Sequence, residues 1–247
     1  MTTSALEIRA LRKQFGGLPA VDGVDLTVPA GDRRLILGPN GAGKTTLFSL
    51  ITGELKPSAG TIRLFGDDIT GIAPYDCARR GLARTYQILT LFPRNTLREN
   101  VVLALLGLSP LRLDPLTPLA RRRELAERAL ETLRLVGLER LADRPLAATA
   151  YGEKRRLEIA LALAQQPRLL LLDEPLAGLS REERRDVQAL LEAIPRTITT
   201  VLIEHDMDTA LSLAETITVM QHGRVLVEGT RAAVVADPRV REVYLVG

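Results

Sequence analysis

Hydrophobic and polar positions follow two different periods along this chain of 247 residues. Apolar residues that alternate with polar ones, or form short runs, predict strands at 6–10, 24–28, 34–37, 61–65, 169–172, 199–203, 217–220 and 224–227. Helical periodicity separates several of these segments and predicts helices at 44–52, 182–194 and 207–214. Because strands that alternate with helices form a mainly parallel sheet with helices on its faces, the pattern predicts an α/β fold.

The middle of the chain has a different pattern. Residues 90–150 are rich in Leu, Ala and Arg, and from Thr96 to about Leu146 their apolar positions repeat with a helical period. Proline interrupts this pattern at Pro110, Pro115 and Pro118. The sequence therefore predicts a mostly helical insertion within the α/β domain, with a loop between its helices.

Composition narrows the possible classes of protein. The chain is 46% apolar and 26% charged with a net charge of +3, which excludes a disordered, collagenous or coiled-coil protein. Only 3% of the residues are aromatic and none is Trp, which argues against a platform on which single-stranded nucleic acid could stack. The densest basic cluster, 121–123, is followed by acidic residues and is typical of a solvated helix face. We therefore expect no nucleic-acid partner.

The cysteine content, the first residues and the lengths of the apolar stretches bear on the cellular compartment and on membrane topology. The single cysteine, Cys77, cannot form an internal disulfide, which fits a reducing compartment. The first residues lack the basic and then apolar pattern of a signal peptide. Apolar stretches such as 101–106 are far shorter than the ~20 residues of a membrane helix. We expect a chain that crosses no membrane, so any membrane role must come through a partner.

A glycine-rich segment between a predicted strand and a predicted helix matches the phosphate-binding pattern GxxxxGK[ST]. Its glycines let backbone N–H groups surround a phosphate, with the helix N-terminus behind them. Lys44 would place a positive charge beside the β- and γ-phosphates, and Thr45 would offer a hydroxyl to Mg²⁺. The nucleotide-binding residues predicted here are Gly38, Pro39, Asn40, Gly41, Ala42, Gly43, Lys44, Thr45 and Thr46.

Two acidic residues follow the apolar run 169–172, which is typical of a strand buried on both faces of a parallel sheet. Such a strand brings Asp173 to the edge of the sheet where the phosphate loop lies, and there it would hold Mg²⁺ through water. Glu174 would then polarise the attacking water as a general base. These elements predict hydrolysis of a nucleoside triphosphate, but kinases, GTPases and helicases also contain them.

The segment Tyr151-Gly152-Glu153-Lys154-Arg155-Arg156-Leu157-Glu158-Ile159-Ala160 decides among these classes, because it resembles the signature helix of the ABC ATPases. The resemblance covers the whole chain. It implies that Gln87 is the Q-loop glutamine, which takes part in catalysis and contacts Mg²⁺, and that His205 is the switch histidine, which senses the γ-phosphate. It also implies that 177–180 is the D-loop and that Phe15 stacks on adenine.

Finer matches resemble one branch, the ATPases of branched-chain amino acid importers, with the urea and amide importers closely similar. They comprise 81–87, 91–93, 96–101, 155–160, 203–207 and the ending 237–245. Departures from the usual ABC pattern occur in two motifs, the signature and the D-loop. The ABC signature LSGGQ aligns with Thr149, Ala150, Tyr151, Gly152 and Glu153, so a hydroxyl is missing at Ala150 and an acid replaces an amide at Glu153; Ser180 replaces the usual D-loop aspartate. The helix N-terminus could still bind phosphate through its N–H groups.

The resemblance implies a P-loop NTPase fold of the ABC ATPase type. A RecA-like parallel-sheet core carries an N-terminal antiparallel β subdomain and a helical signature subdomain. The whole of 1–247 would be one nucleotide-binding domain. Residues 1–90 and 151–247 would form the ATP-binding core, and about 91–150 with the signature helix 151–166 the helical subdomain.

The same resemblance implies ATP and Mg²⁺ as cofactors and a second ABC ATPase subunit, the same chain or a sister, as partner. Two transmembrane permease subunits would complete the transporter, and an extracytoplasmic binding protein would act with it indirectly. The chain would lie on the cytoplasmic face of the membrane and pass movement to the permease through 87–93. Alternatives are a urea or amide importer and an exporter ATPase of the lipopolysaccharide-extraction type. DNA-repair ATPases need a coiled-coil or zinc insertion, and translation-associated ABC proteins need two nucleotide domains, neither of which this sequence contains.

Overall fold

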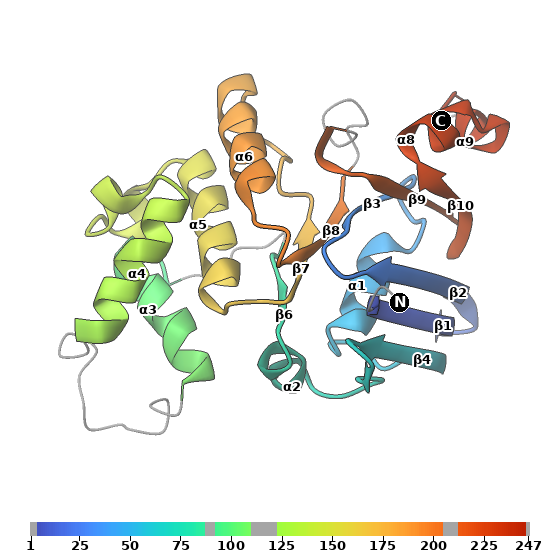
Figure 1. The fold of residues 1–247 in the computed structure, drawn as a ribbon, viewed down its shortest axis with the longest axis horizontal. Coiled ribbons are helices and arrows are strands. Elements are labelled where there is room, and N and C mark those ends of the chain that lie inside the picture. The colour runs from blue at the N-terminus through green and yellow to red at the C-terminus, as the bar shows by residue number, and fades with distance from the viewer. Residues whose placement is uncertain (1–3, 87–91, 110–122, 205–211, 246–247) are drawn as a thin grey trace. The chain divides into compact units, whose positions relative to one another are not determined.

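A computed structural model describes residues 4–86, 92–109, 123–204 and 212–245. The chain divides into two compact units. The first consists of Met1–Arg84, Arg168–Glu174 and Ile194–Gly247, and the second of Thr85–Pro167 and Pro175–Ala193. Both sheets belong to the first unit, and the second unit is helical (Figure 1).

The larger sheet of the first unit has the order β10-β9-β3-β8-β7-β6. Its strands are β3 (Arg33–Leu37), β6 (Leu82–Arg84), β7 (Leu169–Asp173), β8 (Thr199–Ile203), β9 (Thr216–Gln221) and β10 (Arg224–Thr230). All neighbours are parallel except β9 and β10, which form an antiparallel pair. Every residue of β7 and β8 is buried, as expected of strands covered on both faces. The predicted α/β fold is confirmed.

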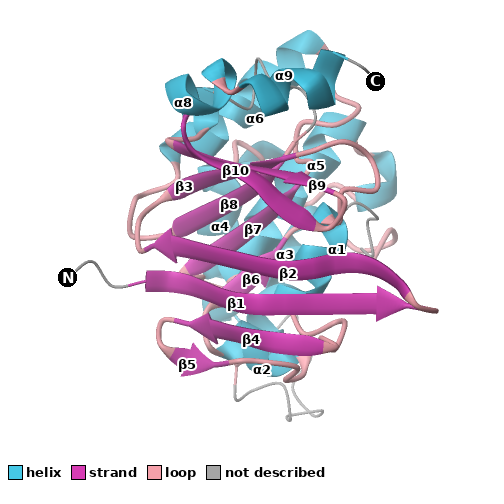
Figure 2. Cartoon of the chain, turned by 90° about the vertical axis from the view of Figure 1, so that its right-hand side faces the viewer, coloured by secondary structure: helices cyan, strands magenta, loops and turns pink. Residues whose placement is uncertain are grey.

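The smaller sheet is antiparallel, with the order β2-β1-β4-β5. It contains β1 (Ser4–Phe15), β2 (Leu18–Pro29), β4 (Ala59–Leu64) and β5 (Asp67–Asp68), and Figure 2 shows β1 and β2 as long neighbouring strands. β1 extends well past the predicted segment 6–10. The register shifts between Ile8 and Leu11, where Ala10 has a positive φ, so the two-residue period breaks although the strand continues.

One hydrophobic core joins both sheets to helix α1 (Lys44–Ile51). Leu47, Phe48, Leu50 and Ile51 from α1 are fully or almost fully buried within it, among apolar residues of the two sheets. Helix α2 (Pro74–Arg79) contributes the buried Cys77. Two short helices, α8 (Arg231–Ala236) and α9 (Pro238–Leu245), follow β10. The core therefore holds α1, and with it the loop that precedes α1, in a defined position.

The second unit contains α3 (Leu97–Leu108), α4 (Arg123–Leu135), α5 (Tyr151–Ala164) and α6 (Arg181–Ala193), with short 3-10 turns at Glu139–Leu141 and Leu146–Ala148. A separate apolar core lies among α3, α4 and α5. The helix-rich character predicted for 90–150 is confirmed where the structure describes it. The three prolines of the predicted loop, and most of the helix predicted at 207–214, lie outside the described residues.

Across the described parts of the chain, each helix is too short or too polar to cross a lipid bilayer.

Candidate functional site

The loop from Gly38 to Gly43 connects the end of β3 with the first residue of α1, as the sequence predicts. Gly43 precedes the helix with a φ of 96°, in the left-handed region that glycine adopts at low cost. A Cβ at this position would overlap with the carbonyl oxygen of Ala20, which belongs to β2. The close approach of β2 thus requires glycine at residue 43. The first N–H groups of α1, directly after this glycine, are not used by hydrogen bonds within the helix and can face a ligand in the loop.

The side chain of Lys44, the first residue of α1, reaches back into this loop, and the residue is 5% exposed. Its Nζ donates to the carbonyl oxygens of Gly38 at 2.6 Å and Pro39 at 3.0 Å. Burial lowers the pKa of the Lys44 ammonium, and the negative charges of Glu174 and Asp173 oppose this shift. A cation held by loop carbonyls among N–H donors is arranged to receive the oxygens of a phosphate.

A cavity of about 330 Å³ opens in front of the loop. This volume lies within the range of small-molecule sites. The residues that line it, all from the first unit, are Phe15, Ala20, Asn40, Gly41, Ala42, Gly43, Lys44, Thr45, Thr46 and Glu174. Seven of the predicted nucleotide-binding residues, Phe15 and the predicted general base therefore face one space.

Phe15 contributes an aromatic ring to the lining of the cavity. It ends β1 at the hairpin with β2, pairs with Leu18 and is 48% exposed. The ammonium of Lys13 lies 5.1 Å from the centre of its ring. An exposed ring beside a phosphate loop offers a flat surface on which a base could stack.

Asp173 ends β7 and is 1% exposed. Its Oδ2 accepts a hydrogen bond of 2.7 Å from Nη2 of Arg84, the last residue of the neighbouring strand β6. Nη1 of Arg84 also reaches Ser49 Oγ and Glu54 Oε2, each at 3.1 Å. Burial raises the pKa of Asp173, while the hydrogen bond and charge of Arg84 act in the opposite direction.

Sequence reasoning did not find Arg84. The sequence feature that could have indicated it is an arginine at the end of a short apolar strand, because a buried charge needs a partner. The sequence does not identify that partner, since Asp173 lies 89 residues away. Arg84 connects the phosphate-loop helix, through Ser49, with the carboxylate predicted to act on Mg²⁺.

The backbone conformation of Glu174 fixes its position at the end of β7. Its φ of 49° lies in the left-handed region, which costs a residue with a Cβ about 1 kcal/mol or more. Its N–H donates to the carbonyl oxygen of Ile203, the last residue of β8, at 3.0 Å. This contact between neighbouring strand ends accompanies the turn that places Glu174 at the cavity.

The donor groups fit Mg²⁺, which prefers oxygen ligands and retains several waters. Thr45 and Glu174 both line the cavity, and the buried Asp173 precedes Glu174 directly. Arg84 already engages Oδ2 of Asp173, which accords with a contact through water rather than direct ligation by that oxygen.

The signature segment lies in the second unit, at the start of α5. Ala150 is the N-cap residue and offers no side-chain acceptor, but its N–H donates to Oε2 of Glu153 at 2.7 Å. The N–H of Gly152 donates to Oε1 of Glu183 at 3.1 Å. Tyr151 is 45% exposed and donates through its hydroxyl to the carbonyl oxygen of Ala177 at 3.4 Å.

Glu183 was also missed at the sequence level, although Ser180 and Glu183 match the spacing of a capping box. Gln87 and His205, predicted to contact Mg²⁺ and the γ-phosphate, lie outside the described residues. Their roles stay predictions.

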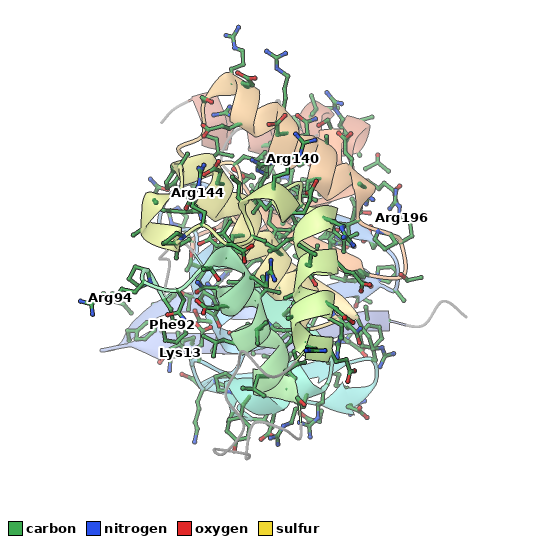
Figure 3. The ribbon with its side chains drawn as sticks, turned by 90° about the vertical axis from the view of Figure 1, so that its left-hand side faces the viewer. Lys13, Phe92, Arg94, Arg140, Arg144 and Arg196 are labelled. Carbon is green, nitrogen blue, oxygen red and sulfur yellow. The ribbon has the colours of Figure 1, made fainter. Side chains whose placement is uncertain are left out.

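Phe92, which belongs to the segment predicted to pass movement to a permease, lies on the surface of the second unit. Phe92 is 55% exposed, and its ring and the side chain of Arg94 point outward (Figure 3). The buried Asn100 holds the backbone of Phe92 in two ways: Oδ1 accepts its N–H at 3.0 Å, and Nδ2 donates to its carbonyl at 3.2 Å. Phe92 is thus an exposed ring on a fixed backbone.

Known proteins resemble this chain over nearly all of its length. The family described as "ABC transporter" matches residues 21–177, and the family described as "Branched-chain amino acid ATP-binding cassette transporter" matches residues 224–245. The high-affinity branched-chain amino acid transport ATP-binding protein BraF of Pseudomonas aeruginosa is 40% identical, over 99% of each chain.

Solved structures agree with these matches. The ADP conformation of an ATP-binding cassette of an ABC transporter is 33% identical and superposes with a TM-score of 0.88, over 99% of each chain. A dimeric post-hydrolysis ATP-binding cassette bound to ADP and Pi is 26% identical, with a TM-score of 0.78, over 91% of this chain and 98% of the other.

Proposed function

This chain belongs to the ABC transporter family, and we propose that it is the ATP-hydrolysing subunit that powers an importer of branched-chain amino acids. One structural observation supports the proposal that the chain hydrolyses ATP: the phosphate loop, Phe15 and Glu174 line a single cavity. The cargo rests on the similarity to BraF and on the family match at 224–245, since no residue of an ATPase subunit has to touch the transported molecule. An importer of urea or amides is the alternative within the same branch.

In the proposed reaction, ATP lies in the cavity with its adenine on Phe15 and its β- and γ-phosphates against the loop and Lys44. Thr45 and Asp173 would hold Mg²⁺, with Gln87 as a further contact. The ion supplies positive charge beside the phosphates. The carboxylate of Glu174 accepts a proton from a water whose oxygen forms a bond to the γ-phosphorus. The bond between that phosphorus and the bridging oxygen breaks, and ADP leaves with the electron pair.

The structure of the family member with ADP and Pi is dimeric, and we propose a head-to-tail dimer for this chain as well. In that arrangement each ATP is covered by residues 150–153 of the opposing subunit, while His205 senses the γ-phosphate. The opposing subunit is a second copy or a related ATPase. ATP favours the closed pair and hydrolysis returns it to the open state.

Two permease subunits complete the proposed transporter, and a binding protein outside the membrane delivers its cargo. The chain would act at the cytoplasmic face, with Phe92 as part of the surface that contacts the permease. The domain assignment that accompanies this function, an ATP-binding core at 1–90 and 151–247 with a helical subdomain at 91–150 and 151–166, stays a prediction.

Recovery of the tagged chain with its membrane partners tests the proposal. We expect two permease proteins, a binding protein encoded with them, and uptake of leucine, isoleucine or valine that stops when the chain is removed. Uptake of urea or an amide instead would assign the alternative, and recovery with lipopolysaccharide-extraction components would refute import.

Glu174→Gln tests the chemistry. The amide keeps the shape of the side chain but accepts a proton poorly, so hydrolysis should fall by about 100- to 10,000-fold. Calorimetry should show that ATP still binds. Near-normal turnover would refute the assignment of Glu174 as the general base.

A further inference from the structure

The carboxylate of Glu183 connects two segments of the second unit that lie 31 residues apart in the sequence. Oε2 accepts the N–H of Ser180 at 2.9 Å, and the N–H of Glu183 donates to Ser180 Oγ at 3.3 Å, which forms a capping box at the start of α6. Oε1 accepts the N–H of Gly152 at 3.1 Å. One side chain thus holds the D-loop segment and the signature helix together.

The contact depends on glycine at residue 152. A Cβ built there would lie 2.8 Å from Cγ of Glu183 and closer still to Oε1, so an alanine would displace the carboxylate. The hydrogen bonds from Ser180 lower the pKa of Glu183, with a smaller contribution from the N–H of Gly152, so the group is an anion at neutral pH.

Two N–H groups at the start of α5 are therefore already bonded to carboxylates of the same chain. Glu153 accepts from Ala150, and Glu183 accepts from Gly152. The N-cap residue, Ala150, adds no hydroxyl. A phosphate that approached this helix end would compete with Glu183 for the N–H of Gly152, and it would be repelled by the negative charge.

We propose that Glu183 is a positioning residue of the ATPase cycle: it holds the signature helix to the D-loop until the γ-phosphate bound by the opposing subunit displaces it from Gly152. The inference rests on the proposed function, because it needs an opposing subunit that brings ATP to this helix end. In this role Glu183 opposes ATP-driven closure. When its hydrogen bond to Gly152 breaks, the signature helix is no longer held to the D-loop by this side chain.

Dimer formation tests the proposal. In the Glu174→Gln chain, which retains ATP, sedimentation velocity gives the concentration of Mg-ATP at which half of the protein is dimeric. The dimer is formed with a second copy or with the partner ATPase recovered from membranes. A hydrogen bond to a charged group contributes about 1 kcal/mol more than a neutral one. Adding Glu183→Gln should therefore lower the required ATP about fivefold.

Glu182→Gln is the matched control. It removes the same charge from an exposed neighbour in the first turn of α6, and it should change the ATP requirement less than about twofold. Glu183→Asp is the second variant if Glu183→Gln does not fold. It keeps the charge but has a shorter reach to Gly152, and it should also lower the ATP requirement.

The possible failures are distinguishable. If calorimetry shows that the Glu174→Gln chain binds no ATP, both the proposed function and this inference are overturned. If ATP binds normally and the folded Glu183 variants need as much ATP as the parent, or more, only the role of Glu183 is overturned.

Discussion

The buried pair of Arg84 and Asp173 makes a quantitative prediction about stability. The two side chains are 5% and 0% exposed, and 2.7 Å separates Nη2 from Oδ2. Replacing Arg84 with methionine keeps much of the side-chain volume but removes the guanidinium that donates a hydrogen bond to the buried carboxylate of Asp173. Removing one partner of a buried ion pair typically costs about 3–5 kcal/mol, so the free energy of unfolding should fall by about that amount.

The loss should depend on pH. Burial already raises the pKa of Asp173 and Arg84 opposes that shift, so Arg84→Met should raise this pKa further. The folded variant then binds a proton more tightly than the unfolded chain does. Between the unfolded pKa of about 4 and the raised folded value, its stability should therefore fall as the pH rises. The deficit relative to the parent chain should be larger at pH 7.5 than at pH 5.

Urea titration followed by far-UV circular dichroism measures the effect without nucleotide, since the chain has no tryptophan for a fluorescence assay. Glu54→Gln is the control. Glu54 is 29% exposed and contacts the same guanidinium at 3.1 Å, but the pair with Asp173 stays in place, so the change should not exceed about 1 kcal/mol. A loss below about 1 kcal/mol for Arg84→Met, or an equal loss at both pH values, would refute the electrostatic account of this pair.

Three further predictions test the site and the proposed partner surface, two of them with a second variant for comparison. Lys44→Ala should abolish most ATP binding in calorimetry, because it removes the buried cation of the phosphate loop; unchanged affinity would contradict the assignment. Phe15→Ala should weaken ATP binding about tenfold through lost stacking, whereas Leu18→Ala, in the same hairpin but outside the cavity lining, should not. Phe92→Ala should reduce transport-coupled hydrolysis but not ATP binding by the isolated chain, and Asn100→Ala should reproduce that loss if the fixed backbone of Phe92 matters.

Much of the fold followed from local pattern. The apolar run 169–172 predicted β7, which is buried along its whole length, and helical periodicity predicted α1 and α6 to within one or two residues. β1 was longer than its pattern predicted, because bulges interrupt the two-residue period without ending the pairing.

The phosphate loop could also be predicted from the sequence, because all the residues that it requires are neighbours in the chain. The loop needs glycine where the backbone must turn, a lysine at its end and a helix directly after it, and these stand within nine consecutive residues. Glu174 was predicted for the same reason, as the residue that follows a buried strand and its aspartate.

Only the tertiary structure decided which charged groups meet. Arg84 pairs with Asp173 because β6 lies beside β7 in the sheet, and Glu183 reaches Gly152 because the start of α6 lies beside the start of α5. The spacing of residues in the sequence does not predict these pairs, whose members lie 89 and 31 residues apart. Backbone conformation and periodicity are properties of neighbouring residues, whereas the partner of a buried charge is chosen by which elements pack together.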